Sequence, residues 1–277
     1  MAGDIQRLPT LRGVAWLTGG LMLIRRQPAR LLLFGLILQF LMGLAQSGLL
    51  GLILILSIPA LTAGMLHVMS AVDRGLRPPL TALFAAFTSG PRLLRLLALG
   101  ALVLALAIIA VMIGLAGAPL VLDEALITRL EQGDVSAVQE LDPALRQRMV
   151  LAVLAGMLLG GCVSYFAVPL VWFADRAAAA AMLAGVMGLL RNWRPMLLLG
   201  FLLLVIAMPA GLLTGVLLVA PAGESAMSPL LALVTLLLVV IFQLLVFGTQ
   251  YAAFKDIFGL PPAAGDEGAR ADDQLVA

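Results

Sequence analysis

The chain has very little of the residue types from which proteins build catalytic and metal sites. Among its 277 residues there is one cysteine, Cys162, and one histidine, His67. A disulfide within the chain is therefore excluded, and so is a metal site built from paired cysteine or histidine ligands. No zinc-protease, phosphate-loop or nucleophile-elbow motif occurs either. We therefore expect a protein that is not an enzyme, with no cofactor and no metal.

Charge is scarce as well, because only 12% of the residues are charged and 62% are hydrophobic. The mean hydropathy is +1.12. A soluble domain is nearer a quarter charged, so this chain lacks the polar surface that a water-soluble fold needs. Its long apolar runs, such as residues 196–207, do not alternate as the strands of a membrane barrel do. The composition predicts an all-α integral membrane protein, since helices satisfy their backbone polar groups in lipid.

Apolar runs of spanning length predict six transmembrane helices in a single domain over residues 1–259. The runs are 30–47, 49–71, 93–116, 149–172, 196–219 and 229–253. Three shorter apolar segments, 11–26, 80–88 and 177–190, are interpreted as interfacial. Residues 118–148 carry most of the acidic side chains between spans and are interpreted as a helical loop, in which Asp142-Pro143 is typical of a helix start. The tail, residues 260–277, is acidic and predicted to be disordered.

The distribution of basic residues predicts the orientation of the chain. Fourteen basic residues fall in loops on one side of the predicted membrane: Arg7, Arg12, Arg25, Arg26, Arg30, Arg74, Arg77, Arg92, Arg95, Arg176, Arg191, Arg194, Lys255 and Arg270. The other side holds Arg129, Arg146 and Arg148. Because cytoplasmic loops carry the excess of Arg and Lys, both termini are predicted to be cytoplasmic and the loop 118–148 extracytoplasmic.

A weak internal repeat is also visible. Three times the chain runs from a short apolar segment through a basic cluster with proline into a spanning helix, and each return helix ends in an aspartate beside a base. These aspartates are Asp73, Asp175 and Asp256. The pattern predicts three copies of an amphipathic helix plus a transmembrane hairpin, in which the proline ends the in-plane helix. The alternative is coincidence, since loops of membrane proteins are commonly rich in Arg and Pro.

Polar residues at membrane depth are costly, so they are the first candidates for a site. Gln39, His67, Gln243 and Tyr251 are the candidate cavity-lining residues. His67 could relay protons, or it could bond to a neighbouring helix. The glutamines could line a polar path or join helices by hydrogen bonds. Gly156 and Gly160 allow close approach of a second helix, either within the chain or in a dimer.

The basic clusters are the candidates for contacts at the membrane surface. Arg25, Arg26, Arg92, Arg95, Arg191 and Arg194 could bind anionic lipid headgroups or a protein partner, or they could serve only to set the topology. A homo-oligomer stays open. The basic residues are divided among separate loops, so no footprint for nucleic acid is expected.

Short motifs spread over nearly the whole chain resemble those of a family of bacterial inner-membrane proteins of unknown function. They are Trp16, Pro28, Pro59 with Gly64, Asp73-x-Gly75, Pro79, Phe84, Pro169-Leu170-Val171, Arg191-Asn192, and Tyr251 with Phe254 and Asp256. The resemblance implies a six-helix fold in the bacterial inner membrane and lends no mechanism. The sequence thus favours a membrane-organising or accessory protein, and the alternative is a transporter or channel for a small neutral or lipidic solute.

Overall fold

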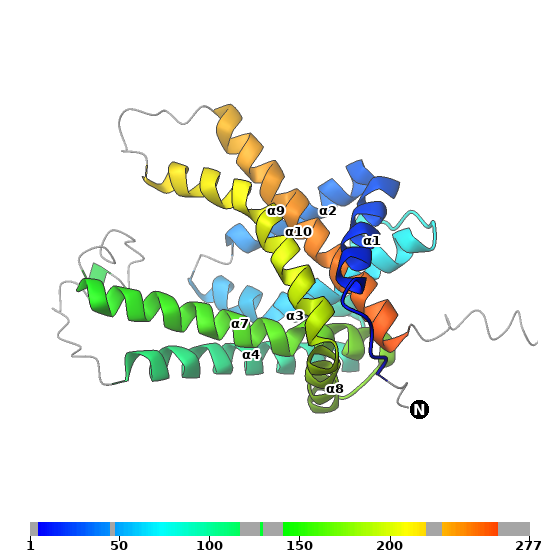
Figure 1. The fold of residues 1–277 in the computed structure, drawn as a ribbon, viewed down its shortest axis with the longest axis horizontal. Helices are drawn as coiled ribbons and strands as arrows, with labels where there is room; N and C mark the ends of the chain where they lie inside the picture. The colour runs from blue at the N-terminus through cyan, green and yellow to red at the C-terminus, as the bar shows by residue number, and fades with distance from the viewer. Residues whose placement is uncertain (1–4, 45–47, 117–127, 130–140, 220–228, 260–277) are drawn as a thin grey trace, which may run out of the picture.

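The computed structural model describes residues 5–44, 48–116, 128–129, 141–219 and 229–259, and these residues form a bundle of helices (Figure 1). Six long helices carry most of the chain: α2 (Pro28–Leu44), α3 (Gly48–Asp73), α4 (Pro91–Leu115), α7 (Pro143–Ala174), α9 (Trp193–Val219) and α10 (Pro229–Phe258). Shorter elements precede three of them: α1 (Arg12–Arg26), the 3-10 helix η1 (Leu80–Thr88) and α8 (Ala178–Arg191). The all-α fold expected from composition is confirmed.

The helix ends follow local chemistry. Asp142 caps α7, because its carboxylate accepts hydrogen bonds from the backbone N–H groups of Ala144 and Leu145, and Pro143 occupies the first turn. The predicted start signal is confirmed, and the helix that begins at this cap continues through the predicted span 149–172. It ends at Asp175, whose φ of 51° lies in the left-handed region. Most of the predicted outer loop and the whole predicted tail lie outside the described residues.

Five helices of the described chain are long and apolar enough to cross a membrane, and a bent pair raises the number to six. The pair is α1 and α2, whose axes meet at 102° across a short break. The 17 residues of α2 rise about 26 Å, which is short of a hydrocarbon core of about 30 Å. The chain is therefore a multi-pass membrane protein by its helices, while a separate crossing by α2 stays a prediction.

The buried core lies at one end of the bundle, where α1, η1 and α8 meet the long helices. It includes Leu31, Phe34, Leu83 and Leu99, together with most of the second half of α3. From this region the α9–α10 pair and the α4–α7 pair run in different directions (Figure 1). The outward faces of these helices are apolar, as at Met112, which is 68% exposed. Such faces suit lipid and not water.

Small residues bring several helices close together. Gly156 and Gly160 of α7 face Ala107 and Val103 of α4, so the predicted small-residue motif packs within the chain. Gly20 of α1 lies against Gly248 and Thr249 of α10 in the same way. At these two crossings the backbone of α7 comes close to α4, and the backbone of α1 comes close to α10.

The order of elements repeats three times along the chain, as a short helix followed by two long ones. The triplets are α1-α2-α3, η1-α4-α7 and α8-α9-α10. The middle triplet differs, because its short element is a 3-10 helix and residues 117–140 between its long helices are mostly outside the described residues. The order fits the predicted unit, and a common ancestry of the three units stays a prediction.

Candidate functional site

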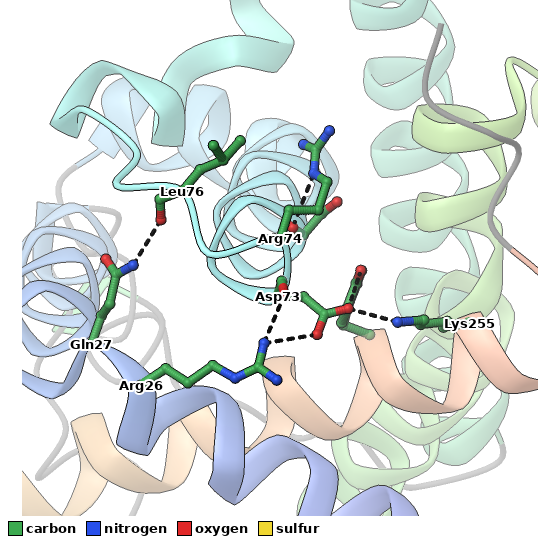
Figure 2. Close-up of polar contacts among 8 residues, drawn as sticks. Arg26, Gln27, Asp73, Arg74, Leu76 and Lys255 are labelled. Carbon is green, nitrogen blue, oxygen red and sulfur yellow. Dashed lines mark hydrogen bonds and ion pairs between the residues drawn. The ribbon is translucent and has the colours of Figure 1, made fainter. Parts of the chain in front are cut away.

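We call the end of the molecule that carries the predicted cytoplasmic arginines the basic end. There Asp73, at the end of α3, joins three helices (Figure 2). Its Oδ1 accepts a hydrogen bond from Arg26 Nη1 at 3.1 Å, and the same nitrogen donates to its backbone carbonyl at 2.7 Å. Its Oδ2 accepts from Lys255 Nζ at 2.7 Å and from the Tyr251 hydroxyl at 3.2 Å. Figure 2 shows Arg26 of α1 and Lys255 of α10 approaching this carboxylate from different sides. One aspartate therefore binds the ends of α1 and α10 to α3.

A second carboxylate, Asp256, links α10 to α1. Its Oδ2 accepts a hydrogen bond from Trp16 Nε1 at 2.8 Å, and Arg12 Nε lies 3.4 Å from the same oxygen. Trp16 is 2% exposed, so it is a core residue. The indole N–H is satisfied by the carboxylate, as a buried tryptophan requires.

These groups surround a hollow of about 420 Å³ between α1, the end of α3 and the end of α10. Its charged lining consists of Arg12, Arg26, Asp73, Lys255 and Asp256, and its apolar lining consists of Ala15, Trp16, Gly19, Met22, Leu23, Tyr251 and Ala252. The volume lies in the range of small-molecule sites. A charged rim over an apolar wall suits an amphiphilic molecule.

The third aspartate, Asp175, makes a separate pair of ion bridges to α4. Arg92 Nε lies 3.1 Å and Arg95 Nη1 2.9 Å from its Oδ1. The hydrogen bond from Arg92 lowers the pKa of this carboxyl below its ordinary value, and the charges of Arg92 and Arg95 act in the same direction, while slight desolvation opposes them. The guanidinium of Arg92 also lies 5.6 Å from the ring centroid of Trp172. Asp175 thus holds the junction between α7 and α8 against the start of α4.

The structure does not bring the four candidate cavity residues into one site. Tyr251 lies in the hollow described above, whereas His67 packs its ring edge-on against Trp172, with centroids 5.7 Å apart. Gln39 is half-buried, and its side chain makes no hydrogen bond within the described residues. The Oε1 atom of Gln243 is buried without a partner there. Of the costly polar groups that sequence reasoning identified, Tyr251 is the one that lines the hollow beside Asp73.

The six candidate arginines divide into two groups. Arg26, Arg92 and Arg95 form ion pairs with Asp73 and Asp175. Arg25, Arg191 and Arg194 form none within the described part of the chain, although Arg191 Nη1 lies 3.5 Å from the Ile5 carbonyl and Arg194 lies over the Trp193 ring. The first group fastens helices together, and the second leaves its charge exposed.

Two residues that position this end were not among the candidate site residues. Asn192, which is 1% exposed, holds the segment before α1, because Leu8 N–H donates to its Oδ1 and its Nδ2 donates to the Gln6 carbonyl, each at 2.9 Å. Arg12 pairs with Asp256 across the sequence. Asn192 stands in the Arg191-Asn192 motif of the resemblance noted above, which is the one sequence signal for it.

Within the described residues, no three His, Cys, Asp or Glu side chains lie together as metal ligands would. No protein-family model, curated protein or solved structure matches the chain. The fold and these contacts define a multi-pass α-helical membrane protein. At its charged end, ion pairs of three aspartates hold the helix ends together.

Proposed function

We propose that the chain is a non-enzymatic protein of a bacterial inner membrane, in which its arginine-rich end binds anionic lipids and organises the bilayer around it. The observation that carries this proposal is an imbalance of charge. Thirteen of the fourteen basic residues assigned to this side are described, beside three described aspartates, Asp73, Asp175 and Asp256. Over the full sequence this predicted side holds fourteen basic and eight acidic residues, an excess of six. All three aspartates already hold basic partners. The surplus charge needs its counterions from outside the described chain.

Anionic headgroups are the natural counterions at this position. Each basic side chain near an anionic leaflet contributes about 1 kcal/mol to binding. The short helices bring arginines to the ends of the spans, where headgroups lie. Arg25 lies in the last turn of α1, Arg191 ends α8, and Arg194 is the second residue of α9. Such an arrangement supports a role that is exercised at the membrane surface.

The test uses the division of the arginines into two groups of equal charge. Purified protein is reconstituted with equal amounts of phosphatidylglycerol and phosphatidylethanolamine, and the lipids retained by each chain are measured by mass spectrometry. We expect phosphatidylglycerol to be enriched around the wild type and the enrichment to fall at least fivefold in Arg25→Gln/Arg191→Gln/Arg194→Gln. The matched control, Arg26→Gln/Arg92→Gln/Arg95→Gln, should retain more of the enrichment and melt at a lower temperature. Unchanged enrichment in the first variant, with intact topology, would refute the proposal.

The hollow beside Tyr251 favours a second candidate function, transport of a small neutral or lipidic solute. Its charged rim and apolar wall could admit an amphiphile from the membrane surface. Ala15 is an exposed residue of its lining, so Ala15→Trp would fill the hollow without disturbing the core. Transport requires that wild-type proteoliposomes move a fluorescent lipid between leaflets and that this variant does not. Equal rates in protein-free vesicles would remove this candidate.

A further inference from the structure

A second hollow lies where residues 7–10 pass over the junction of α8 and α9. Its volume is about 290 Å³, and it is lined by Arg7, Leu8, Pro9, Thr10, Arg191, Trp193, Arg194 and Pro195. Three guanidinium groups from two distant parts of the sequence therefore surround one hollow. None of the lining residues is acidic, unlike the hollow beside Tyr251, in which Asp73 and Asp256 face the cations.

The position of Arg7 is imposed by the fold. The backbone on either side of it is held by the buried Asn192, through the Gln6 carbonyl and the Leu8 N–H. The Gln6 N–H also donates to the Ile257 carbonyl at 3.2 Å. Asn192 lies between Arg191 and Trp193 in sequence, so the residue that fixes the Arg7 segment is the direct neighbour of two residues that line the other side of the hollow. The fold thus brings three arginines to the lining of one hollow.

The hydrogen-bonding capacity of these arginines is almost unused. Each guanidinium carries five N–H donors. Within the described residues, the one hydrogen bond that the three groups make is the long contact of 3.5 Å from Arg191 Nη1 to the Ile5 carbonyl. Arg194 lies 5.4 Å from the ring centroid of Trp193, a contact that leaves its N–H groups free to donate in the guanidinium plane. The hollow therefore offers many donors, a triple positive charge and no acceptor side chain of opposite charge.

We propose that this hollow binds the phosphate group of an anionic lipid headgroup. Guanidinium forks match the oxygens of a phosphate in geometry and charge, and several of them can bind one phosphate. The volume is at the lower limit for small-molecule sites, which fits a headgroup and not a whole lipid. Trp193, which is 49% exposed, and Leu8 and Pro9 give an apolar side along which the glycerol and first acyl carbons can lie. The inference rests on the proposed function and deepens it by naming one saturable site.

The experiment measures binding in a neutral detergent, where no anionic surface exists to attract basic residues in general. Full-length protein is titrated calorimetrically with dioctanoyl phosphatidic acid, with dioctanoyl phosphatidylcholine and with inorganic phosphate. The site variant is Arg7→Gln/Arg194→Gln. The control is Arg77→Glu, which changes the charge by the same two units at an exposed arginine that lines neither hollow and makes no ion pair among the described residues.

We expect wild-type protein to bind about one phosphatidic acid per chain, at least tenfold more tightly than phosphatidylcholine. The site variant should bind it at least tenfold more weakly, because two charge-assisted contacts are lost, and the control should stay within twofold of the wild type. Both variants should melt within about 2 °C of the wild type, since the arginines are exposed. If the site variant has a lower melting temperature than this, the single variant Arg194→Glu replaces it in the titration, because Arg194 lies exposed in the first turn of α9.

Equal weakening in the site variant and the control would overturn the inference, because the basic end would then bind phosphate by its overall charge. So would a wild type that binds phosphatidic acid no better than phosphatidylcholine. Either result leaves the proposed function standing if phosphatidylglycerol is still enriched in the bilayer experiment, so the two failures are distinguishable. If an equal concentration of inorganic phosphate displaced the lipid, the hollow would still be a phosphate site, but its assignment to a lipid headgroup would be overturned.

Discussion

At the scale of single residues, Asn192 is the side chain on which the N-terminal segment depends most. It makes three hydrogen bonds to backbone groups, at Gln6, Leu8 and Gly188, and it is almost fully buried. Asn192→Ala would leave the Gln6 carbonyl and the Leu8 N–H without this partner, at a cost of about 2–3 kcal/mol. We expect a lower melting temperature in detergent and faster proteolysis before α1. Gln6→Ala is the control, because Asn192 binds the backbone carbonyl of Gln6 and not its side chain. Equal melting temperatures of the two variants would disprove the role of Asn192 in holding this segment.

Asp175 provides a prediction about pH. Its pKa is lowered by the hydrogen bond from Arg92, so the folded protein holds the carboxylate charged at a pH where the unfolded chain begins to protonate it. The stabilisation is therefore complete above the unfolded pKa of about 3.9 and is lost as the pH falls through the lower folded value. The side chain is 56% exposed, so the effect should stay below about 1 kcal/mol.

The variant for this measurement is Asp175→Asn, because asparagine tolerates the left-handed backbone conformation at the end of α7. The wild type should melt above the variant at pH 6, and the difference should shrink as the pH is lowered below about 4. Added salt at pH 6 should also reduce it. A difference that is constant from pH 6 to pH 3 would mean that the carboxylate charge does not stabilise this junction.

At the scale of elements, the crossing of α1 and α10 depends on a glycine pair. A Cβ atom on Gly20 would lie 2.8 Å from the backbone nitrogen of Thr249, which cannot move without shifting α10. Gly20→Ala should therefore destabilise the protein by about 1–3 kcal/mol. Gly19→Ala is a close control, since its Cβ would lie 3.4 Å from Ala252 Cβ, an ordinary contact. Thermal melting compares the two, and equal melting temperatures would show that α1 does not need this close approach.

The same element explains what sequence can and cannot predict here. Helix positions follow from apolar runs and local signals such as Asp142-Pro143, so predicted and observed spans differ by a few residues at most ends. Partners across the bundle do not follow, because a helical pattern says which face is apolar and not which helix covers it. Asp73 stands beside Arg74 in sequence, yet it binds Arg26 and Lys255, the latter 182 positions away. The hollow beside Tyr251 depends on these distant pairs, so sequence reasoning missed it.

At the scale of the whole molecule, orientation and span number are linked. If α2 and α3 both cross the membrane, residues before α1 and residues between η1 and α4 lie on one side, and the start of α7 lies on the other. If α2 does not cross, the first two regions lie on opposite sides. The basic residues of both regions favour the first arrangement, because positive charge collects in the cytoplasm. The predicted orientation therefore requires that the 17-residue α2 cross, helped by local thinning of the bilayer.

Cysteine accessibility decides this question directly, because Cys162 is the one native cysteine and can be replaced by serine. In that background, single cysteines replace the exposed residues Gln6, Thr88 and Gln147. In intact cells, a maleimide that cannot cross the inner membrane should label the cysteine at 147 and spare those at 6 and 88 until the cells are lysed. Labelling at 88 alone, or at 6 and 147 together, would show that α2 fails to cross and that the chain has five spans. Labelling at 6 and 88 alone would show that the orientation is the reverse of the predicted one, with the arginine-rich end facing away from the cytoplasm.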